Sequence, residues 1–302
     1  YYALVIEGEE CLRVDLMRET LGMELLEDLA NKGYSEYVAL SLPLPNGKIH
    51  PISLASRKPF LTDFDERRVI VQTLLASSLD SLYQGSAAAQ LASTYIGPKT
   101  GARVLAGDFF RGNTQTMDAG VLFCDIRGFT ALSARLGAHE VVNVVNQIFE
   151  VVGEKISCHG GEILKFIGDA LLAVFPVEED DSGQKAAQAM IQAVREALIG
   201  LSALGEQLTV PVAVGFGGHL GEVLYGNIGT TKRLDFTIMG PAVNLASRLE
   251  GLCKKFEVDA VFSDEVSRFC DDVVVLGTEV VKGIDQPVKA WGLKPQENAE
   301  PS

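Results

Sequence analysis

Apolar and polar positions in the second half of the chain follow two periods, one typical of strands and one of helices. Short apolar runs predict strands at residues 120–124, 162–167, 170–175, 210–218, 223–228, 236–239, 273–281 and 288–293. Apolar residues three and four apart predict helices at residues 139–156, 184–204 and 241–252, with a short helix near Ser263. Gly168-Asp169 between two of these runs indicates a hairpin. Alternating strands and helices, with hairpins among them, predict an α+β or α/β sandwich.

The first half is patterned differently and predicts a small domain that leads into one long helix. Strands are expected at residues 37–42 and 49–54, on either side of a turn. Thr62 or Asp63 is a typical helix cap, and an apolar stripe then continues over residues 66–96 until Gly97-Pro98 ends it. Such a helix either pairs with a second copy of itself or packs on the N-terminal domain. Residues 99–116 are expected to form a connector.

Composition and charge exclude two broad classes of protein. The chain has 302 residues, of which 47% are hydrophobic, so it has the apolar content for two folded domains and is not globally disordered. Its 26 basic and 40 acidic residues give a formal net charge of 26 − 40 = −14 at pH 7. Because nucleic acid requires a basic face, we expect no nucleic-acid partner. An anionic ligand would need locally positive groups or metal ions.

Cysteine use and hydropathy predict a cytoplasmic protein. The five cysteines are odd in number and form no Cys-x-x-Cys pair, which favours a reducing compartment; Cys11 is expected in a core. No apolar stretch reaches the roughly 18–20 residues of a membrane helix. Because residue 1 is Tyr rather than Met, we expect a fragment of a longer protein, and any upstream membrane anchor or sensor would lie outside this sequence.

The first candidate motif is Phe-Cys-Asp-Ile-Arg-Gly-Phe-Thr at residues 123–130. Asp125 ends a predicted buried strand and precedes a glycine turn and a helix. In one interpretation it caps the helix or completes the turn. In the other it holds a divalent metal, while N–H groups at the helix start receive phosphate oxygens.

The second motif, at residues 160–169, carries Lys165 on a strand and Asp169 at a hairpin tip. Gly-Asp is a common turn, and a lysine on a strand is most often solvated. However, a second carboxylate close to Asp125 would complete a two-metal site, which suits in-line attack at phosphorus.

The third motif is Asp-Phe-Thr-Ile-Met-Gly-Pro-Ala-Val-Asn-Leu-Ala-Ser-Arg-Leu-Glu at residues 235–250. Asn244 and Arg248 are four apart, so they share one face of the predicted helix. They form either a cradle for an oxyanion or a polar surface pair with Glu250 nearby. Lys282, between a strand and a glycine turn, carries no signal by itself.

Taken together, these motifs resemble the class III nucleotidyl cyclases, the adenylate and guanylate cyclases. The resemblance covers about residues 117–293 and rests on Phe-x-Asp-x-x-Gly-Phe-Thr, Lys-Phe-Ile-Gly-Asp, Gly-Asn-Ile-Gly and Val-Asn-Leu-Ala-Ser-Arg-Leu-Glu, in this order. It implies an α+β, ferredoxin-like catalytic domain that works as a head-to-tail homodimer with composite sites. It further implies that Asp125, Asp169 and the carbonyl of Ile126 hold two Mg²⁺ or Mn²⁺ ions per site.

The same resemblance assigns the substrate-binding residues. Lys165 and Thr237 would read the base, Asn244 and Arg248 would act in catalysis, and Lys282 would bind the terminal phosphates. Phe129 and Thr130, at the start of the helix after Asp125, are also expected to bind substrate. Glu222 departs from those relatives that have an arginine there, which leaves the triphosphate to Lys282, the metals and the backbone.

Base choice favours ATP, because a lysine can donate to adenine N1, whereas the guanine edge presents donors that suit a carboxylate. The expected function is therefore an adenylate cyclase of the bacterial type, which makes cyclic AMP and pyrophosphate. The alternatives are a guanylate cyclase and a nucleotide-binding regulatory module without turnover. No protein group is assigned as general base.

The resemblance also sets the expected domain boundaries. Residues 1–83 would form a sensor domain, residues 84–116 a linker helix and connector, residues 117–295 the catalytic domain and residues 296–302 a tail. Residues 37–83 weakly resemble the closing half of a GAF domain, a small α/β sensor fold. An unknown regulatory ligand or upstream sensor would act through this part.

Overall fold

The computed structural model describes residues 11–294, apart from residues 45, 46, 48, 61, 109, 179, 180, 209 and 285. The predicted tail, and residues 45, 46 and 48 of the turn between the first two predicted strands, lie outside the described residues. The chain divides between Leu91 and Ala92 into two compact units, which are described separately below. No helix among the described residues is both long and apolar enough to cross a membrane.

The first unit contains a three-stranded antiparallel sheet in the order β1-β2-β3. Its elements are β1 (Cys11–Asp15), α2 (Glu24–Asn31), β2 (Glu36–Pro43) and β3 (Ile49–Ser56). One side of the sheet packs against α2 around Val14, Leu26 and Tyr37, all of which are buried. The two predicted strands are present, and β1 is a third that the hydrophobic pattern did not predict. The GAF resemblance stays a prediction.

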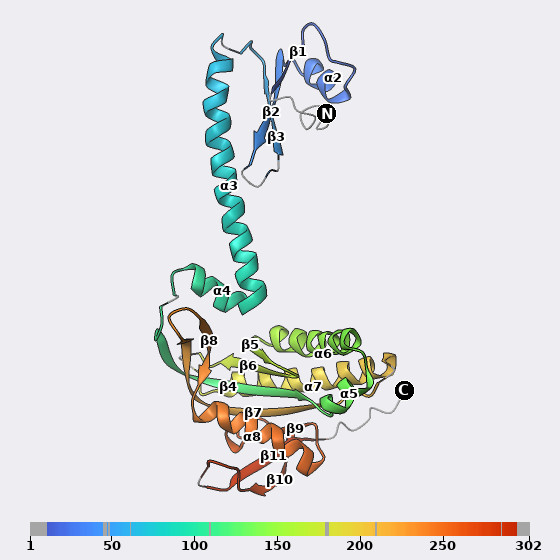
Figure 1. Ribbon diagram of the computed structural model, residues 1–302, viewed down its shortest axis with the longest axis vertical. Coiled ribbons are helices and arrows are strands. Elements are labelled where there is room, and N and C mark those ends of the chain that lie inside the picture. The colour runs from blue at the N-terminus through green and yellow to red at the C-terminus, as the bar shows by residue number, and fades with distance from the viewer. Residues whose placement is uncertain are drawn as a thin grey trace. The chain divides into compact units, whose positions relative to one another are not determined.

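A 33-residue helix, α3 (Phe64–Ile96), follows this sheet (Figure 1). It begins directly after Asp63, whose Oδ2 accepts a hydrogen bond of 2.6 Å from Arg67 Nε. It ends at Gly97, which adopts a φ of +87° that favours glycine over other residues. Both predicted ends are therefore confirmed. None of its 33 residues, all of them described, is buried.

The second unit is built on an eight-stranded sheet. Its elements are α4 (Pro98–Leu105), β4 (Thr114–Ile126), α5 (Phe129–Arg135), α6 (Ala138–Cys158), β5 (Glu162–Ile167), β6 (Ala170–Pro176), α7 (Gln184–Gln207), β7 (Val214–Gly229), β8 (Leu234–Met239), α8 (Pro241–Phe256), β9 (Ala260–Phe262), α9 (Asp264–Ser267), β10 (Val273–Glu279) and β11 (Val288–Leu293). The strand order is β10-β11-β9-β7-β4-β6-β5, and β8 pairs with β7 outside this path. Within it, β4-α6-β5-β6-α7-β7 has the strand order of the ferredoxin-like fold, as predicted.

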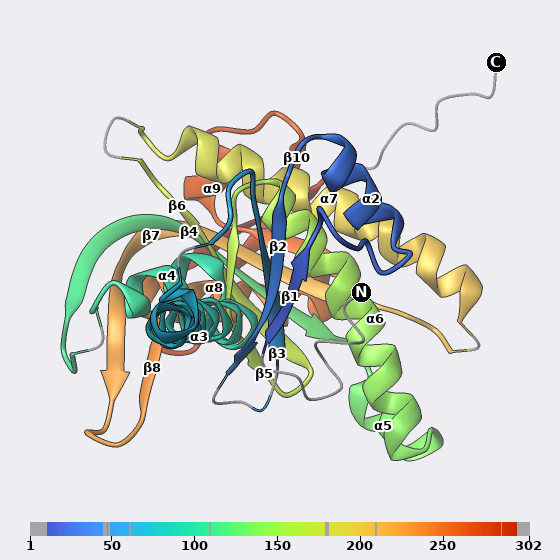
Figure 2. The same ribbon diagram turned by 90° about the horizontal axis from the view of Figure 1, so that it is seen from above.

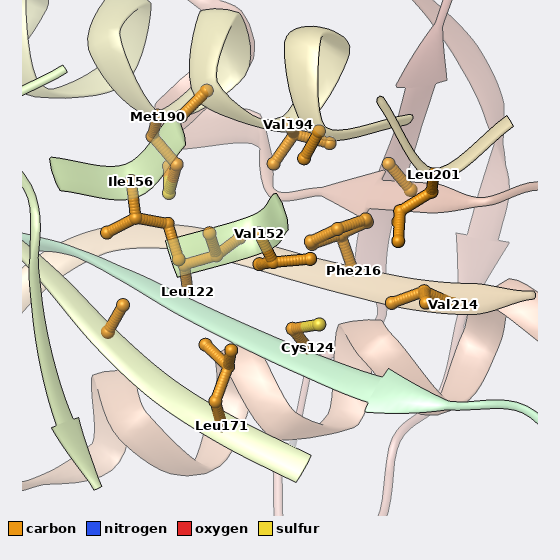
Figure 3. Close-up of a cluster of buried hydrophobic side chains, with 14 of the residues drawn as sticks. Leu122, Cys124, Val152, Ile156, Leu171, Met190, Val194, Leu201, Val214 and Phe216 are labelled. Carbon is orange, nitrogen blue, oxygen red and sulfur yellow. The ribbon is translucent and has the colours of Figure 1, made fainter. Parts of the chain in front are cut away.

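Helices cover both faces of this sheet. On one face lie α6 and α7, and α8 lies on the other (Figure 1). Figure 3 shows the core under α6 and α7, where Leu122 and Cys124 of β4 meet Met190 of α7 and Phe216 of β7. The opposite face buries Val121 of β4 with Phe236 of β8 and part of α8.

Two sequence predictions are corrected here. The strands expected at residues 210–218 and 223–228 form one strand, β7, because its central glycines are not a break in the sheet. The connector expected at residues 99–116 contains α4 and the first residues of β4. Pro98 occupies the first turn of α4, where its missing N–H carries no cost.

A buried carboxylate fixes α4 to the start of β5. Glu162 is 5% exposed, and its Oε1 accepts hydrogen bonds from Thr100 N at 3.0 Å and Thr100 Oγ1 at 2.8 Å. Its Oε2 accepts a hydrogen bond of 3.3 Å from Tyr225 of β7. Nearby, Lys99 Nζ donates to the carbonyl of Gly160 at 3.0 Å. The strand that carries Lys165 is thus held at its beginning by the N-terminus of α4.

The glycines of β7 set how closely α8 approaches the sheet. A Cβ on Gly217 would fall well inside van der Waals contact of Glu250 N and Ala246 O, which are backbone atoms of α8. A Cβ on Gly215 would lie 2.5 Å from Glu250 Oε1. Because backbone cannot move aside as a flexible side chain can, position 217 requires glycine, whereas the contact at position 215 is with the end of the Glu250 side chain.

We therefore expect Gly217→Ala to destabilise the second unit by about 3 kcal/mol or more, since the added methyl group pushes α8 off the sheet. Thermal and urea unfolding measure this. Gly251→Ala is the matched control, because Gly251 lies on α8 with no atom within 4 Å of its Cβ position. Gly251→Ala should stabilise the second unit by up to about 1 kcal/mol, because alanine has a higher helix propensity than glycine. Equal effects of the two changes would contradict the packing argument.

Candidate active site

Two carboxylates meet where β4 ends. Asp125 is the penultimate residue of β4, and Asp169 lies in the turn between β5 and β6. The two segments are joined by a hydrogen bond of 3.2 Å from Ile126 N to the Asp169 carbonyl. Burial raises the pKa of Asp125, and the negative charge of Asp169 raises it further, while a hydrogen bond from the Ile126 amide opposes both. The two predicted metal ligands are therefore brought together.

A third carboxylate, Glu250 of α8, faces this pair. Burial and the charges of Asp125 and Asp169 raise the pKa of Glu250 to about 7, although Arg127 partly offsets them. Arg127 itself is held by an ion pair of 3.5 Å to Asp259 and by a hydrogen bond from its Nη2 to the Val258 carbonyl. The sequence placed Glu250 only as a neighbour of Asn244 and Arg248.

The chemistry of these donors fits a divalent cation. Carboxylate oxygens are hard ligands of the kind that Mg²⁺ and Mn²⁺ prefer. Mutual repulsion already raises the pKa of Asp125, and a bound cation would relieve it. Among the described residues, no group of three or more His, Cys, Asp or Glu is arranged to hold a metal. The ligand role of the Ile126 carbonyl stays a prediction.

Asn244 and Arg248 lie on the other side of α8 from Glu250. At about 100° per residue they are separated by about 40° around the helix, whereas Arg248 and Glu250 are separated by about 200°. Asn244 and Arg248 are both exposed. Within the described part of the chain neither side chain has a hydrogen bond or an ion pair. The shared face that the sequence predicted is confirmed, and it points away from this chain's own carboxylate pair.

Lys165 and Thr237 lie on β5 and β8, away from the carboxylate pair. Lys165 Nζ bonds Asp235 Oδ2 at 2.7 Å, and this bond is the main reason that the pKa of Asp235 is lowered. Asp235 and Thr237 share one face of β8, because Phe236 between them is buried on the other. Figures 1 and 2 show β8 and α5, the helix that follows Asp125, at opposite ends of the domain.

The remaining predicted residues lie at the surface or at a helix start. Lys282 is exposed in the turn after β10, with no hydrogen bond or ion pair among the described residues. Phe129 is partly buried and packs against the core below α6 and α7. Thr130 is exposed in the first turn of α5. The structure therefore does not gather all the predicted site residues into one cluster within a single chain.

Three functional candidates escaped the sequence reasoning. Glu250 and Asp235 lie in the quoted motif at residues 235–250, and their only signal was proximity to residues already chosen. Glu162 opens a strand that is apolar apart from Lys165, and an acidic residue at that position suggests a buried partner. Burial and pairing of such groups depend on distant segments, here α4, β5 and β8.

Comparisons with known proteins agree with this fold and these motifs. Residues 113–294 match the adenylate and guanylate cyclase catalytic domain family. An adenylate cyclase of Anabaena cylindrica is 34% identical over 190 residues, which are 61% of this chain and 38% of that protein. The crystal structure of the adenylyl cyclase CyaB from P. aeruginosa is 29% identical, with a TM-score of 0.53, covering 62% of this chain and 98% of that one.

The guanylyl cyclase Cya2 is 31% identical, also with a TM-score of 0.53, over 62% of this chain and 98% of that one. The family match extends over more than half of the chain, which therefore belongs to the adenylate and guanylate cyclase catalytic domain family, as the motifs predicted. The chain spans less than half the length of the Anabaena relative.

The raised pKa of Glu250 predicts a pH-dependent stability. Its folded pKa of about 7 exceeds the ordinary 4.5, so the folded chain binds more protons between these values and stability falls as pH rises through them. Glu250→Gln removes this loss and should stabilise the protein at pH 8 by up to about 3 kcal/mol.

Unfolding at pH 5 and pH 8, with chelator present, measures this difference. Glu206→Gln, on the exposed side of α7, is the control; it keeps Glu250 and should therefore lose as much stability between pH 5 and pH 8 as the wild type does. A Glu250→Gln variant that is no more stable than the wild type at pH 8 would contradict the burial of this charge.

Proposed function

We propose that the chain is an adenylate cyclase that converts ATP to 3′,5′-cyclic AMP and pyrophosphate at sites shared by two copies. The observation that carries this proposal is that opposite sides of α8 present different functional residues. One side of the helix brings Glu250 to the carboxylate pair, and the opposite side presents Asn244 and Arg248 to solvent with no partner among the described residues. The acidic and basic halves of one active site therefore face different directions.

A homodimer resolves this separation. In a head-to-tail pair, Asp125 and Asp169 of one copy would face the base-reading and phosphate-binding residues of the other. Because every copy carries both halves, two equivalent sites result. The exposed positions of Asn244, Arg248 and Lys282 support this arrangement, since an arginine and a lysine that have no partner in the described part of the chain are suited to receive an anion.

Within such a site each residue has a distinct task. Asp125 and Asp169, with the Ile126 carbonyl, would hold two Mg²⁺ or Mn²⁺ ions, which lower the pKa of the ribose 3′-hydroxyl and neutralise the triphosphate. Arg248 would stabilise the charge that develops on the α-phosphoryl oxygens as the 3′-oxygen attacks, and Asn244 would orient the ribose. Lys282 and the amides of Phe129 and Thr130 would bind phosphate oxygens.

ATP is the proposed substrate because Lys165 is a donor where the base is read. The similarity to the guanylyl cyclase Cya2 supports GTP as a second candidate. The proposed domain limits remain residues 1–83, 84–116 and 117–295, with residues 1–83 as a sensor of the GAF type that regulates the catalytic unit.

The direct test is turnover of ATP and of GTP with Mn²⁺. We expect cyclic AMP as the main product, and we expect Asp125→Asn to lower the rate by at least about 10³-fold, because one metal ligand is lost. Glu206→Gln is the control, with an unchanged rate. A wild type that binds ATP but yields no cyclic nucleotide at any protein concentration would show that the chain is a binding module.

Mixing two inactive variants tests the shared site. Asp169→Ala and Lys165→Ala should each be nearly inactive alone. Random pairing gives half of the dimers one intact site of two, so about a quarter of the wild-type activity should return if the sites act independently. Confirmed heterodimers without recovered activity would rule out the shared site.

A further inference from the structure

A charged pair outside the carboxylate cluster is not explained by the proposed roles. Lys165 of β5 and Asp235 of β8 are far apart in sequence, yet Nζ and Oδ2 lie 2.7 Å apart. Each side chain is 39% exposed, so the pair is open to a ligand and is not buried for stability. Surface ion pairs of this kind contribute little to folding, which leaves a binding role as the better explanation.

The local backbone of β5 directs the Lys165 side chain toward Asp235. The pairing of β5 with β6 shifts register between Ile163 and Lys165, so the ladder is irregular, as at a β-bulge, immediately before the lysine. Bulges re-aim the side chains that follow them. Phe166 contacts Phe149 of α6 on the other face, with ring centroids 4.8 Å apart, and this contact holds Lys165 on the side of β8.

Ligand access and free hydrogen-bonding capacity are both present. Lys165 and Asp235 line a cavity of about 620 Å³ together with Phe236 and Leu234. Asp235 Oδ2 is used by Lys165, whereas among the described residues Oδ1 has only the exposed Arg233 in ion-pair range, with Nε at 3.9 Å. The pair therefore presents a donor and an acceptor side by side at an open site.

That order of donor and acceptor matches adenine and opposes guanine. Adenine presents the N1 acceptor beside the N6 amine, which donates, so an ammonium and a carboxylate bond both. Guanine presents N1–H, a donor, beside the O6 acceptor. With guanine the ammonium would face a donor and the carboxylate would face an acceptor, and both contacts are unfavourable.

We propose that Asp235 is a specificity-determining residue, which positions Lys165 for adenine N1 and accepts the adenine N6 amine. This inference rests on the proposed function in that it takes Lys165 as a base-reading residue. It adds a residue to the Lys165 and Thr237 pair. It also explains the preference for ATP in two ways, because the pair would bind the adenine edge and disfavour the guanine edge.

The test compares kcat and KM for ATP and for GTP in Asp235→Asn and Asp235→Glu. Asparagine keeps the shape, loses the charge and offers an N–H to guanine O6. We expect its preference for ATP over GTP, as the ratio of kcat/KM values, to fall about tenfold, the effect of one charge-assisted hydrogen bond. The fall should come mainly from a raised KM for ATP, with kcat within about twofold. Asp235→Glu should keep most of the preference.

The matched control is Glu279→Gln, which breaks a lysine–carboxylate pair of 2.6 Å with Lys255 elsewhere in the same unit. It should leave the ATP to GTP ratio unchanged. The proposal is overturned if Asp235→Asn keeps the wild-type ratio, or if it loses activity equally with both nucleotides.

Binding of 3′-deoxy ATP and 3′-deoxy GTP, which lack the attacking hydroxyl, separates this inference from the proposed function. The ratio of their dissociation constants in Asp235→Asn and in wild type tests Asp235 without turnover. If the wild type makes no cyclic nucleotide yet the binding ratio falls in the variant, the proposed activity fails and the role of Asp235 stands. An unchanged binding ratio removes that role whether or not the chain is a cyclase.

Discussion

The close approach of α8 to β7 is the constraint on which the site depends. It is possible because Gly217 has no side chain, and the backbone of α8 occupies the space that a Cβ would need there. At this distance the helix is fixed in rotation as well as position. Glu250 is then directed at Asp125 and Asp169, while Arg248, about 200° further around the helix, is directed away from them. The proposed chemistry, which needs both carboxylate-bound metal and Arg248, would therefore be completed by a second copy of the chain.

This separation also explains how a chain with a net charge of −14 can bind an anion. The acidic residues at the end of β4 repel one another and would attract divalent cations. The groups suited to phosphate, Arg248 and Lys282, stand apart from them and have no ion pairs among the described residues. Lys165 is different, because Asp235 engages it directly. A lysine paired with a carboxylate offers both a donor and an acceptor to the edge of a base. A basic side chain that has no ion pair is better suited to a phosphate group. The environments of the three residues thus fit their proposed tasks: Arg248 and Lys282 would bind phosphate, and Lys165 would bind the base.

The sequence predicted most elements of the fold, because they follow from local patterns: alternation, helical spacing and turn residues. The pairing of Asp125 with Asp169 was expected only from the resemblance to the cyclases. The sequence pattern failed at β7, where residues 219–222 were left between two predicted strands although the strand is continuous there, and Gly221 lies close to the side chains of His219 and Ala242. It missed α4, whose N-terminus depends on Glu162, 62 residues further along the chain. It also missed Asp235 and Glu250, whose importance lies in what β5 and the end of β4 bring to them. Local signals locate single residues well, whereas contacts between distant segments decide which of them act together.

The central claim is that one copy carries two halves of different sites. The measurement that tests it most directly is the specific activity with ATP and Mn²⁺ over a wide range of protein concentrations, with the oligomeric state followed by sedimentation in the same buffer. We expect specific activity to fall in step with the fraction of dimer as the protein is diluted. A specific activity that stays constant while the protein sediments as a monomer would contradict the account.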